Sequence, residues 1–157
     1  MFKSIKKMET IIKLYKDLTI DELYEILKLR SIVFVVEQNC IYQDLDDIDK
    51  ASYHIYMKEK DKPEIKVYLR VFEKDKDTAQ IGRVVTAQDK RRKGYASELI
   101  KKGIEIAKNE MKKNKVYLEG QVYASKLYEK LGFKIISDEF LEDGIPHYKM
   151  LKNLDEE

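Results

Sequence analysis

The sequence has one cysteine, two histidines and two prolines among 157 residues. The single thiol, Cys40, cannot form an intrachain disulfide, and with His54 and His147 it makes a poor ligand set for structural zinc. We therefore expect neither a disulfide framework nor a metal site. The scarcity of proline, and the lack of repeats and low-complexity tracts, predict one continuous domain over residues 1–157, with a core over about 10–152.

Long apolar runs are also missing. The longest, Ile32–Val36, has five residues, whereas a membrane-spanning helix needs about 20. The N-terminal segment 1–8 carries Lys3, Lys6 and Lys7, but no apolar stretch of about 7–15 residues follows it, so it does not resemble a secretory signal. We expect a cytoplasmic protein without a membrane partner.

Charges of opposite sign are separated along the sequence, although the formal net charge is only +2. From Arg83 to Lys115 there are eleven basic and four acidic residues. Acidic residues gather in two clusters: Asp44, Asp46, Asp47 and Asp49, and then Asp138, Glu139, Glu142 and Asp143. We expect the basic block to hold an anion and the acidic clusters to attract a cation. Nucleic-acid binding is an alternative for the basic block, but the near-neutral total argues against it.

Hydrophobic periodicity predicts an α/β chain. Thr19 and Glu22 have the spacing of a capping box at the start of a first helix, and small or apolar residues repeat at helical intervals from Tyr95 to about Met111. Strands are predicted at 10–15, 53–58, 65–72, 79–86, 116–118, 133–136 and 147–151, with a further helix at 124–131. The predicted order is β-α-β-β-β-α-β-α-β-β.

The passage from strand to helix at 81–96 carries the clearest chemical signal. The first N–H groups of a helix lack internal partners and lie at the positive end of its dipole, so this turn predicts an anion site. Gly94 has no Cβ to block a phosphate, and Arg91, Arg92 and Lys93 add attraction for a multiply charged ligand. Neither G-x-x-x-x-G-K-[ST] nor G-x-G-x-x-G is present, which disfavours a kinase or a dehydrogenase.

Two motifs connect this turn to a known superfamily. Residues 91–96 read R-R-K-G-Y-A and match the Q/R-x-x-G-x-G/A pattern of the GNAT N-acetyltransferases, while 124–133 resemble the second signature of that superfamily, A-x-x-x-Y-x-x-x-G-F. Segments 29–46 and 142–147 are similar to its ElaA-like branch. The chain departs from many members of that branch at Glu119, where they have His or Gly.

The resemblance implies a single GNAT-type domain of the α+β kind. Its central sheet would be mixed and mostly antiparallel, with about six to seven strands and about three to four flanking helices. The resemblance also implies acetyl-CoA as a cosubstrate and no metal. The residues that would bind the coenzyme are Val84, Val85, Arg91, Arg92, Lys93, Gly94, Tyr95 and Ala96. In the superfamily the strand that corresponds to 79–86 splays from its neighbour and frees backbone amides for the pantetheine arm and the acetyl oxygen.

Acetyl transfer to an amine needs a neutral nucleophile and a proton for the departing thiolate. An alkylammonium has a pKa near 10.4, so removing its proton at pH 7 costs about 4.6 kcal/mol, and a base is useful. Glu37, Glu119 and His147 are the candidate bases, and the choice among them is open. The resemblance implies that Tyr128 donates the proton to the thiolate; the alternative is that its ring only packs in the core.

Four residues are candidates for contacts with the acceptor: Gln38, His54, Arg70 and Gln121. For His54 and Arg70 the alternative is a structural role, as a satisfied sheet residue and as a member of a salt bridge. We expect an acetyl-CoA-dependent N-acetyltransferase that acts on a primary amine of a small molecule, as a monomer or homodimer and without nucleic acid. Alternatives are an amino-sugar phosphate N-acetyltransferase and a non-catalytic module that binds coenzyme A or nucleic acid.

Overall fold

The computed structural model describes residues 7–155. Most of the lysine-containing N-terminal segment therefore lies outside the described residues. Over the part that is described, no helix combines the length and the apolar character needed to cross a membrane.

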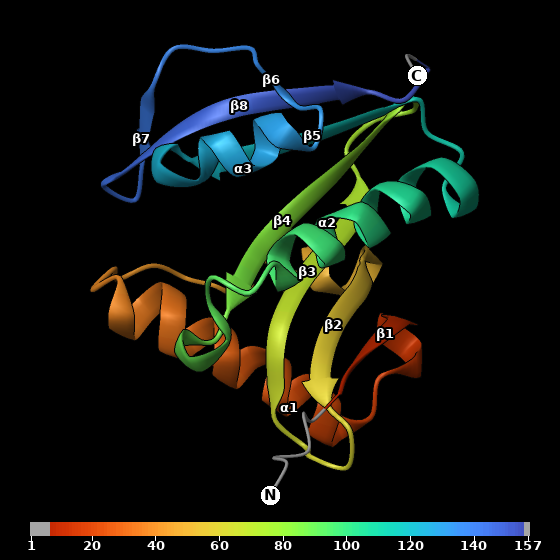
Figure 1. Cartoon of the computed structure of the whole chain (residues 1–157), viewed down its shortest axis with the longest axis vertical. Helices are drawn as coiled ribbons and strands as arrows, with labels where there is room; N and C mark the ends of the chain where they lie inside the picture. Colours follow the sequence, from red (N-terminus) through yellow and green to blue (C-terminus); the bar gives the residue numbers. More distant parts are fainter. Residues whose placement is uncertain (1–6, 156–157) are drawn as a thin grey trace, which may run out of the picture.

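A single mixed sheet forms the centre of the molecule (Figure 1). Within residues 7–155 it has eight strands: β1 Met8–Leu14, β2 Tyr53–Glu59, β3 Ile65–Glu73, β4 Thr78–Thr86, β5 Lys115–Gln121, β6 Lys134–Ile135, β7 Phe140–Glu142 and β8 Ile145–Asn153. The strand order is β1-β2-β3-β4-β5-β8-β6, and β7 also pairs with β8. All pairs are antiparallel except β4 with β5, so the predicted mixed, mostly antiparallel sheet is confirmed. The short strand β7 was not predicted.

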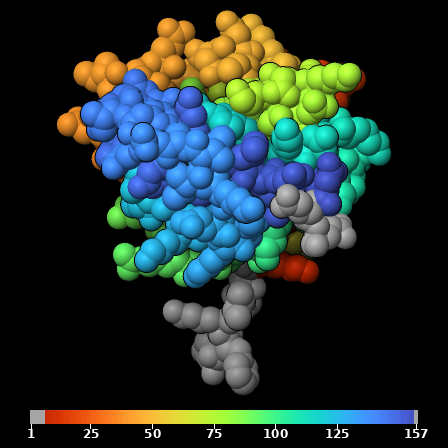
Figure 2. Space-filling view, turned by 90° about the horizontal axis from the view of Figure 1, so that it is seen from above, coloured from red at the N-terminus to blue at the C-terminus, as the bar shows by residue number. Residues whose placement is uncertain are grey.

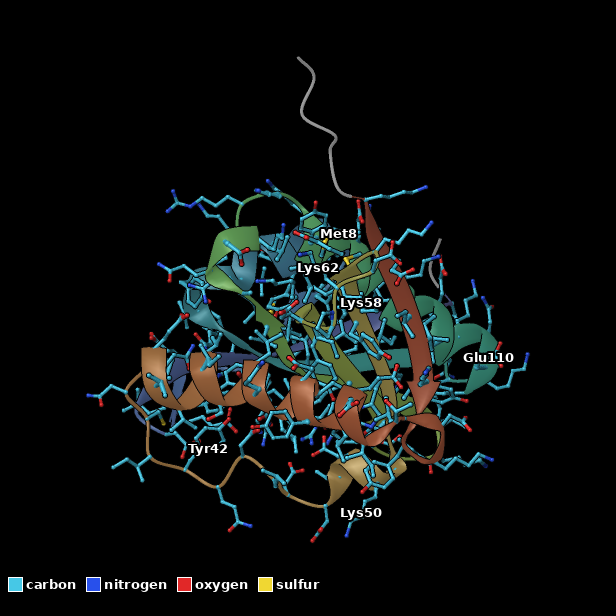
Figure 3. All side chains as sticks on the ribbon, turned by 90° about the horizontal axis from the view of Figure 1, so that it is seen from below. Met8, Tyr42, Lys50, Lys58, Lys62 and Glu110 are labelled. Atoms are coloured by element: carbon cyan, nitrogen blue, oxygen red, sulfur yellow. The ribbon has the colours of Figure 1, made fainter. Side chains whose placement is uncertain are left out.

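Helices cover both faces of the sheet. They are α1 Ile20–Arg30, α2 Tyr95–Glu105 and α3 Ser125–Lys130, with the π-helical segments η2 Ser31–Glu37 and η5 Ile106–Glu110 and the 3-10 turns η1 Tyr15–Asp17, η3 Ile48–Ala51, η4 Gln88–Lys90 and η6 Val122–Ala124. Figure 3 shows α1 lying across one face of the sheet, with the loop that carries Tyr42 beside it. The segments η2 and η5 directly continue α1 and α2, so the apolar run at Ile32–Val36 is helical.

The two faces of the sheet bury separate apolar clusters. On the α1 side, Ile26 and Leu29 pack with Tyr56, Tyr68 and neighbouring apolar residues. On the other face, the larger cluster joins α2 to Leu69, Val71, Ile81, Leu118 and Tyr128, among others. A Cβ placed on Gly103 of α2 would lie 3.1 Å from the Ile81 side chain and 3.3 Å from that of Val71, so glycine allows close packing of this helix on the sheet.

The predicted capping box at the start of α1 is confirmed. Thr19 Oγ1 accepts a hydrogen bond from the Glu22 amide at 3.1 Å, and Glu22 Oε1 accepts one from the Thr19 amide at 2.8 Å. Glu22 also bonds Lys13 Nζ at 2.8 Å and the Tyr56 hydroxyl, which ties α1 to β1 and β2. Partial burial raises the pKa of Glu22, but the bonds from Lys13, Tyr56 and Thr19 outweigh it and lower the pKa to about 2.

The separation of β4 from β5 positions the site. These strands pair only where Thr78–Gln80 lie beside Lys115–Tyr117, and then they diverge (Figure 1). On its other edge β4 contains a β-bulge, because Arg83 and Val84 together lie opposite the single residue Leu69 of β3. Arg83 has a φ of 53°, the backbone distortion that a bulge requires. Beyond Gln80, no strand within residues 7–155 pairs with the edge of β4 that faces β5, and the polar backbone groups of this edge are available to a ligand.

Candidate active site

A cleft of about 990 Å³ follows the gap between β4 and β5. It brings together all but two of the predicted site residues: Glu37, Gln38, Val84, Val85, Arg91, Arg92, Lys93, Gly94, Tyr95, Ala96, Glu119, Gln121, Tyr128 and His147. The segment around residues 38–46, drawn in orange in Figure 2, lies along one side of the C-terminal strands in blue. Gln38 Nε2 and Gln121 Oε1 approach to 3.5 Å across this boundary.

The turn before α2 has the geometry of an anion site. Gly94 is the N-cap of α2, with a φ of 80°, and a Cβ built on it would meet no atom within 4 Å, so the space above it is open. Arg92 also has a positive φ, 63°. The first amides of α2, at Tyr95–Ser97, have no carbonyl partner within the helix. An anionic group of a ligand can therefore approach these amides directly.

The side chain of Arg91 is already engaged. Arg91 Nη2 donates to Glu37 Oε2 at 2.7 Å, and Arg91 Nε donates to the Thr86 carbonyl at 3.0 Å. Glu37, one of the candidate bases, is thus paired with a guanidinium and holds η2 against the turn, whereas Arg92 and Lys93 line the cleft with exposed side chains.

Tyr128 lies on the α3 wall of the cleft and is only 6% exposed. Its ring packs edge-on against Phe133, with 6.2 Å between the ring centroids. Among residues 7–155 no group hydrogen-bonds its hydroxyl, and burial raises the pKa of Tyr128 above its ordinary value. The phenol is therefore protonated at neutral pH and has a free O–H to donate.

Gly120, which the sequence analysis did not single out, makes room for this ring. A Cβ placed on Gly120 of β5 would lie 2.8 Å from Cε2 of Tyr128 and 3.0 Å from its Cδ2. Any side chain at this position would displace the tyrosine. A glycine within a strand is the available signal, since it indicates close approach of another group.

The opposite wall carries a cluster of ionisable groups. Glu119 Oε1 accepts a hydrogen bond from the Tyr117 hydroxyl at 2.9 Å, and His147 Nε2 lies 3.5 Å from Glu142 Oε2. Partial burial and the nearby charge of Glu119 raise the pKa of Glu142, while His147 opposes the shift. Glu142 belongs to β7, the strand that was not predicted, and it was expected only as a member of an acidic cluster.

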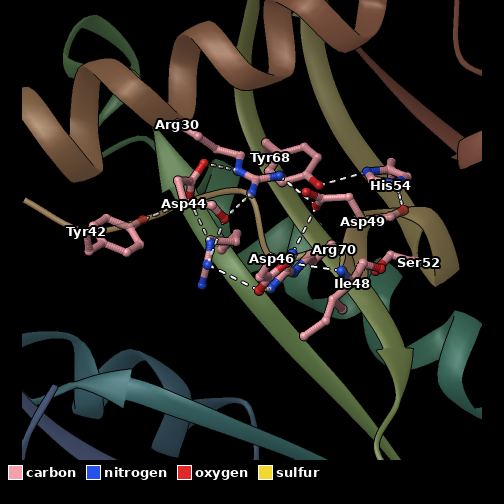
Figure 4. A network of polar contacts seen from close by, with 11 residues as sticks. Arg30, Tyr42, Asp44, Asp46, Ile48, Asp49, Ser52, His54, Tyr68 and Arg70 are labelled. Carbon is pink, nitrogen blue, oxygen red and sulfur yellow. Dashed lines mark hydrogen bonds and ion pairs between the residues drawn. The ribbon is translucent and has the colours of Figure 1, made fainter. Parts of the chain in front are cut away.

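Three arginines and three aspartates form a network beside the cleft (Figure 4). Arg30 Nε donates to Asp44 Oδ2 at 2.8 Å and Arg30 Nη1 to Asp49 Oδ1 at 2.7 Å. Arg70 bonds both oxygens of Asp46, at 2.8 and 2.6 Å, and Arg83 Nε donates to Asp44 Oδ1 at 2.8 Å. Because α1, β3 and β4 each supply one arginine, the network fastens the loop after η2 to the sheet.

This network corrects two predicted substrate contacts, because His54 and Arg70 do not line the cleft. The His54 ring is fully buried, and its two nitrogens lie 2.8 Å from the Tyr68 hydroxyl and from the Asp49 carbonyl. Burial lowers the pKa of His54. Arg70 is 2% exposed, and its guanidinium is occupied by Asp46 and Asp49. Both residues have the structural role that was the alternative.

The network also shows that the expectation of a cation-attracting first acidic cluster was wrong. Asp44, Asp46 and Asp49 are neutralised by arginines and do not form an acidic entrance. Bonds from Arg70, together with the charge of Arg83, outweigh partial burial and lower the pKa of Asp46 to about 2. The second cluster keeps its charge in the cleft, where Glu142 and Asp143 are both exposed.

The basic block is also partly neutralised. Arg83 bonds Asp44, Lys90 bonds Glu59 and Lys113 bonds Glu73. Over the described part of the chain, no set of His, Cys, Asp and Glu side chains has the arrangement of a metal site. Cys40, which lines the cleft, contacts the Asp143 carbonyl at 3.5 Å through its thiol.

Comparisons with known proteins identify the class of enzyme to which this fold and cleft belong. Residues 25–154 match the acetyltransferase (GNAT) domain, and the chain belongs to this family. The family and the fold support an acyl-CoA N-acyltransferase in general.

Within the family the chain lies in the ElaA-like branch. It is 34% identical to Protein ElaA of Escherichia coli over 89% of this chain and 93% of that protein, and the crystal structure of E. coli ElaA superposes with a TM-score of 0.86. A UPF0039 protein of Schizosaccharomyces pombe is 39% identical, over 93% of this chain and 97% of that protein. An acyl-CoA N-acyltransferase from Pseudomonas aeruginosa has a TM-score of 0.86 and 32% identity, over 93% of this chain and 99% of the other.

Proposed function

We propose that the protein transfers an acetyl group from acetyl-CoA to a primary amine of a small molecule. One observation carries the proposal: a single cleft contains both the open turn at Gly94 and the free hydroxyl of Tyr128. The first suits a phosphate, and the second suits a leaving group that needs a proton. The similar protein from P. aeruginosa is described as an acyl-CoA N-acyltransferase, in keeping with this assignment.

The residues present fit the coenzyme. The amides at the start of α2 would bind its pyrophosphate, with Arg92 and Lys93 adding positive charge. The free edge of β4 at Val84 and Val85 would bind the pantetheine arm and polarise the acetyl carbonyl. When bound, the coenzyme supplies a thioester, whose carbonyl carbon is open to attack by an amine. Tyr128 would then protonate the thiolate that leaves.

The acceptor would enter between the loop after η2 and the strands β5, β7 and β8. Gln38 and Gln121 lie at this boundary and can hydrogen-bond its polar groups. Glu119, Glu142 and Asp143 make this side of the cleft negative, which favours a cationic amine. A sugar phosphate would need free cations here, and Arg83 is already bonded to Asp44 and Asp46.

Two assays test the proposal. Calorimetry should show coenzyme A binding that is weakened more by Gly94→Val than by Arg92→Ala, because a β-branched residue cannot adopt the φ of 80° and would cover the amides. Thiol release from acetyl-CoA should depend on an added amine in a panel of monoamines, diamines and amino-sugar phosphates. Coenzyme binding without amine-dependent thiol release would reject the transferase and leave a non-catalytic binding module.

A further inference from the structure

Three ionisable side chains from three strands converge on the acceptor side of the cleft. Glu119 comes from β5, Glu142 from β7 and His147 from β8, and all three line the cleft that contains the free hydroxyl of Tyr128. The Glu119 carboxyl group lies close enough to that of Glu142 for its negative charge to raise the pKa of Glu142. Two carboxyl groups in this contact hold a proton between them more readily than either would alone.

His147 completes the cluster in a fixed orientation. The ring is 6% exposed and lies against Phe140, with 5.9 Å between ring centroids. Its Nδ1 lies 2.6 Å from the Ile145 carbonyl, so Nδ1 carries the hydrogen and donates it there. In the neutral ring Nε2 is then an acceptor, and it faces Glu142 Oε2 at 3.5 Å. His147 therefore holds Glu142 in place and favours its ionised form, the form that a base needs.

The charged surroundings leave Glu142 with little cationic compensation. Glu119 and Asp143 both disfavour its ionised form, and among the described residues no lysine or arginine forms a salt bridge with it. The ionisable groups on the strands packed around it are Lys115, Tyr117 and Glu119 on β5 and His147, Tyr148, Lys149 and Lys152 on β8. Asp143 lies in the β7–β8 turn, and Lys74 Nζ lies 4.5 Å from the Tyr117 ring centroid. None of these lysines is hydrogen-bonded to Glu142 or Glu119.

From this arrangement we infer that Glu142 is the base that removes a proton from the acceptor ammonium, with Glu119 and His147 as its positioning residues. The inference rests on the proposed function. It differs from the sequence-based expectation, in which Glu37, Glu119 and His147 were the candidate bases. Glu37 is paired with Arg91, and Glu119 is bonded to Tyr117, whereas Glu142 is exposed to the cleft with His147 behind it.

The proposed sequence balances in atoms and charge. An ammonium N–H bond breaks, and the proton forms an O–H bond on the Glu142 carboxylate. The neutral amine attacks the thioester carbonyl, so that a C–N bond forms and the C–S bond breaks. Tyr128 gives its phenolic proton to the thiolate, and the second proton lost by the attacking nitrogen restores the phenol. Glu142 releases its proton to water, and the turnover yields one amide, one thiol and one proton.

The test uses two acceptors that differ in protonation. Butylamine is protonated at neutral pH and needs a base, whereas trifluoroethylamine is largely unprotonated and does not. We expect Glu142→Gln to lower kcat/KM for butylamine by about 10²- to 10⁴-fold and to change kcat/KM for trifluoroethylamine far less. The matched control is Glu139→Gln, which removes an exposed carboxylate of the same segment that does not line the cleft. It should leave both values unchanged.

A second readout does not depend on turnover. In the free protein, carbon-13 NMR of the glutamate carboxyl groups should show Glu142 titrating above the ordinary glutamate value of about 4.3, and Glu119→Gln should return it toward that value. Calorimetry should show unchanged coenzyme A affinity in Glu142→Gln.

The possible outcomes separate the inference from the proposed function. An equal loss for both amines, or no loss for either, would overturn the role of Glu142. If wild-type thiol release is lost in Tyr128→Phe but retained in Glu142→Gln, only the inference fails. If the wild type releases no thiol with any amine, the transferase and its base are both rejected.

Discussion

Two groups of acidic residues have opposite surroundings in the folded chain. Each group lies close together in the sequence: the first is Asp44, Asp46 and Asp49, and the second is Glu139, Glu142 and Asp143. The first group is bonded to Arg30, Arg70 and Arg83, and two of its members are buried. The second group has no arginine partner among the described residues and is exposed, and its members Glu142 and Asp143 line the cleft. One group fastens a loop to the sheet, and the other keeps its charge where a ligand can meet it.

The difference shows that the role of an acidic cluster cannot be assigned until the partners of its carboxylates in the folded chain are known. The arginines of the network lie 14 to 39 residues from Asp44 in the sequence, on α1, β3 and β4, and only the fold of the sheet brings them to the loop. Buried ion pairs are costly to desolvate and destabilising to break, whereas a like-charged pair at a cleft stores repulsion that a cationic ligand can relieve. The predictions below test this contrast.

The largest effect should come from removing the central cation of the network. Arg30→Met removes the fully buried cation that Asp44 and Asp49 share and leaves them only Arg83 and Arg70, so we expect the free energy of unfolding to fall by about 3–5 kcal/mol. Urea denaturation measures this loss. The control Lys28→Met removes an exposed cation paired with Glu25 and should cost less than about 0.5 kcal/mol. Equal losses in both variants would contradict the structural role of the network.

Within the cleft, the loss of one hydroxyl should change catalysis and leave the fold intact. We expect Tyr128→Phe to lower kcat by about a hundredfold or more, because the thiolate loses its proton donor. Coenzyme A affinity and the free energy of unfolding should change little, since the hydroxyl has no hydrogen bond to lose among residues 7–155. An unchanged kcat, under conditions where chemistry limits the rate, would remove Tyr128 from the mechanism.

A smaller effect should follow from displacing the same ring. Gly120→Ala places a methyl group 2.8 Å from Tyr128 Cε2, so we expect kcat to fall by about tenfold and stability by about 1–3 kcal/mol. The two effects separate in a double-mutant cycle. In the Tyr128→Phe background Gly120→Ala should cost little further activity, because the group it mispositions is already absent. Additive losses of activity would show that Gly120 acts independently of the tyrosine hydroxyl.

The smallest effect should be a difference in the pH dependence of stability. The pKa of Asp46 is lowered to about 2, so its stabilisation is complete above the unfolded-state value of about 3.9 and is lost on acidification toward pH 2. The pKa of Glu142 is raised, so its carboxyl destabilises the fold as pH rises through the folded-state value. Glu142→Gln should therefore stabilise the protein at neutral pH but not below about pH 4. Urea titrations at several pH values should show that the gain in free energy of unfolding in Glu142→Gln appears only above about pH 4. A gain of the same size at every pH would argue against the raised pKa.

The sequence predicted the features that depend on local patterns. The capping box at Thr19, the order of the longer elements and the turn at Gly94 follow from spacing within a few residues. Strand β7 has three residues, too few to show an alternating pattern, and it forms because it pairs with β8. The bulge at Arg83 depends on the register of β4 against β3, which the sequence does not display. The roles of His54 and Arg70 could not be predicted because burial and partners, not residue type, decide them.

The central claim is that the first acidic group maintains the fold and that Glu142 of the second group performs the chemistry. The most direct measurement compares Asp49→Asn with Glu142→Gln, recording for each variant both the free energy of unfolding and kcat/KM with butylamine. Asp49 is buried between Arg30 and Arg70 and does not line the cleft. We predict a loss of stability with little change in kcat/KM for Asp49→Asn, and a loss of about a hundredfold or more in kcat/KM without a loss of stability for Glu142→Gln. Two variants that lose stability and activity to the same extent would contradict this division.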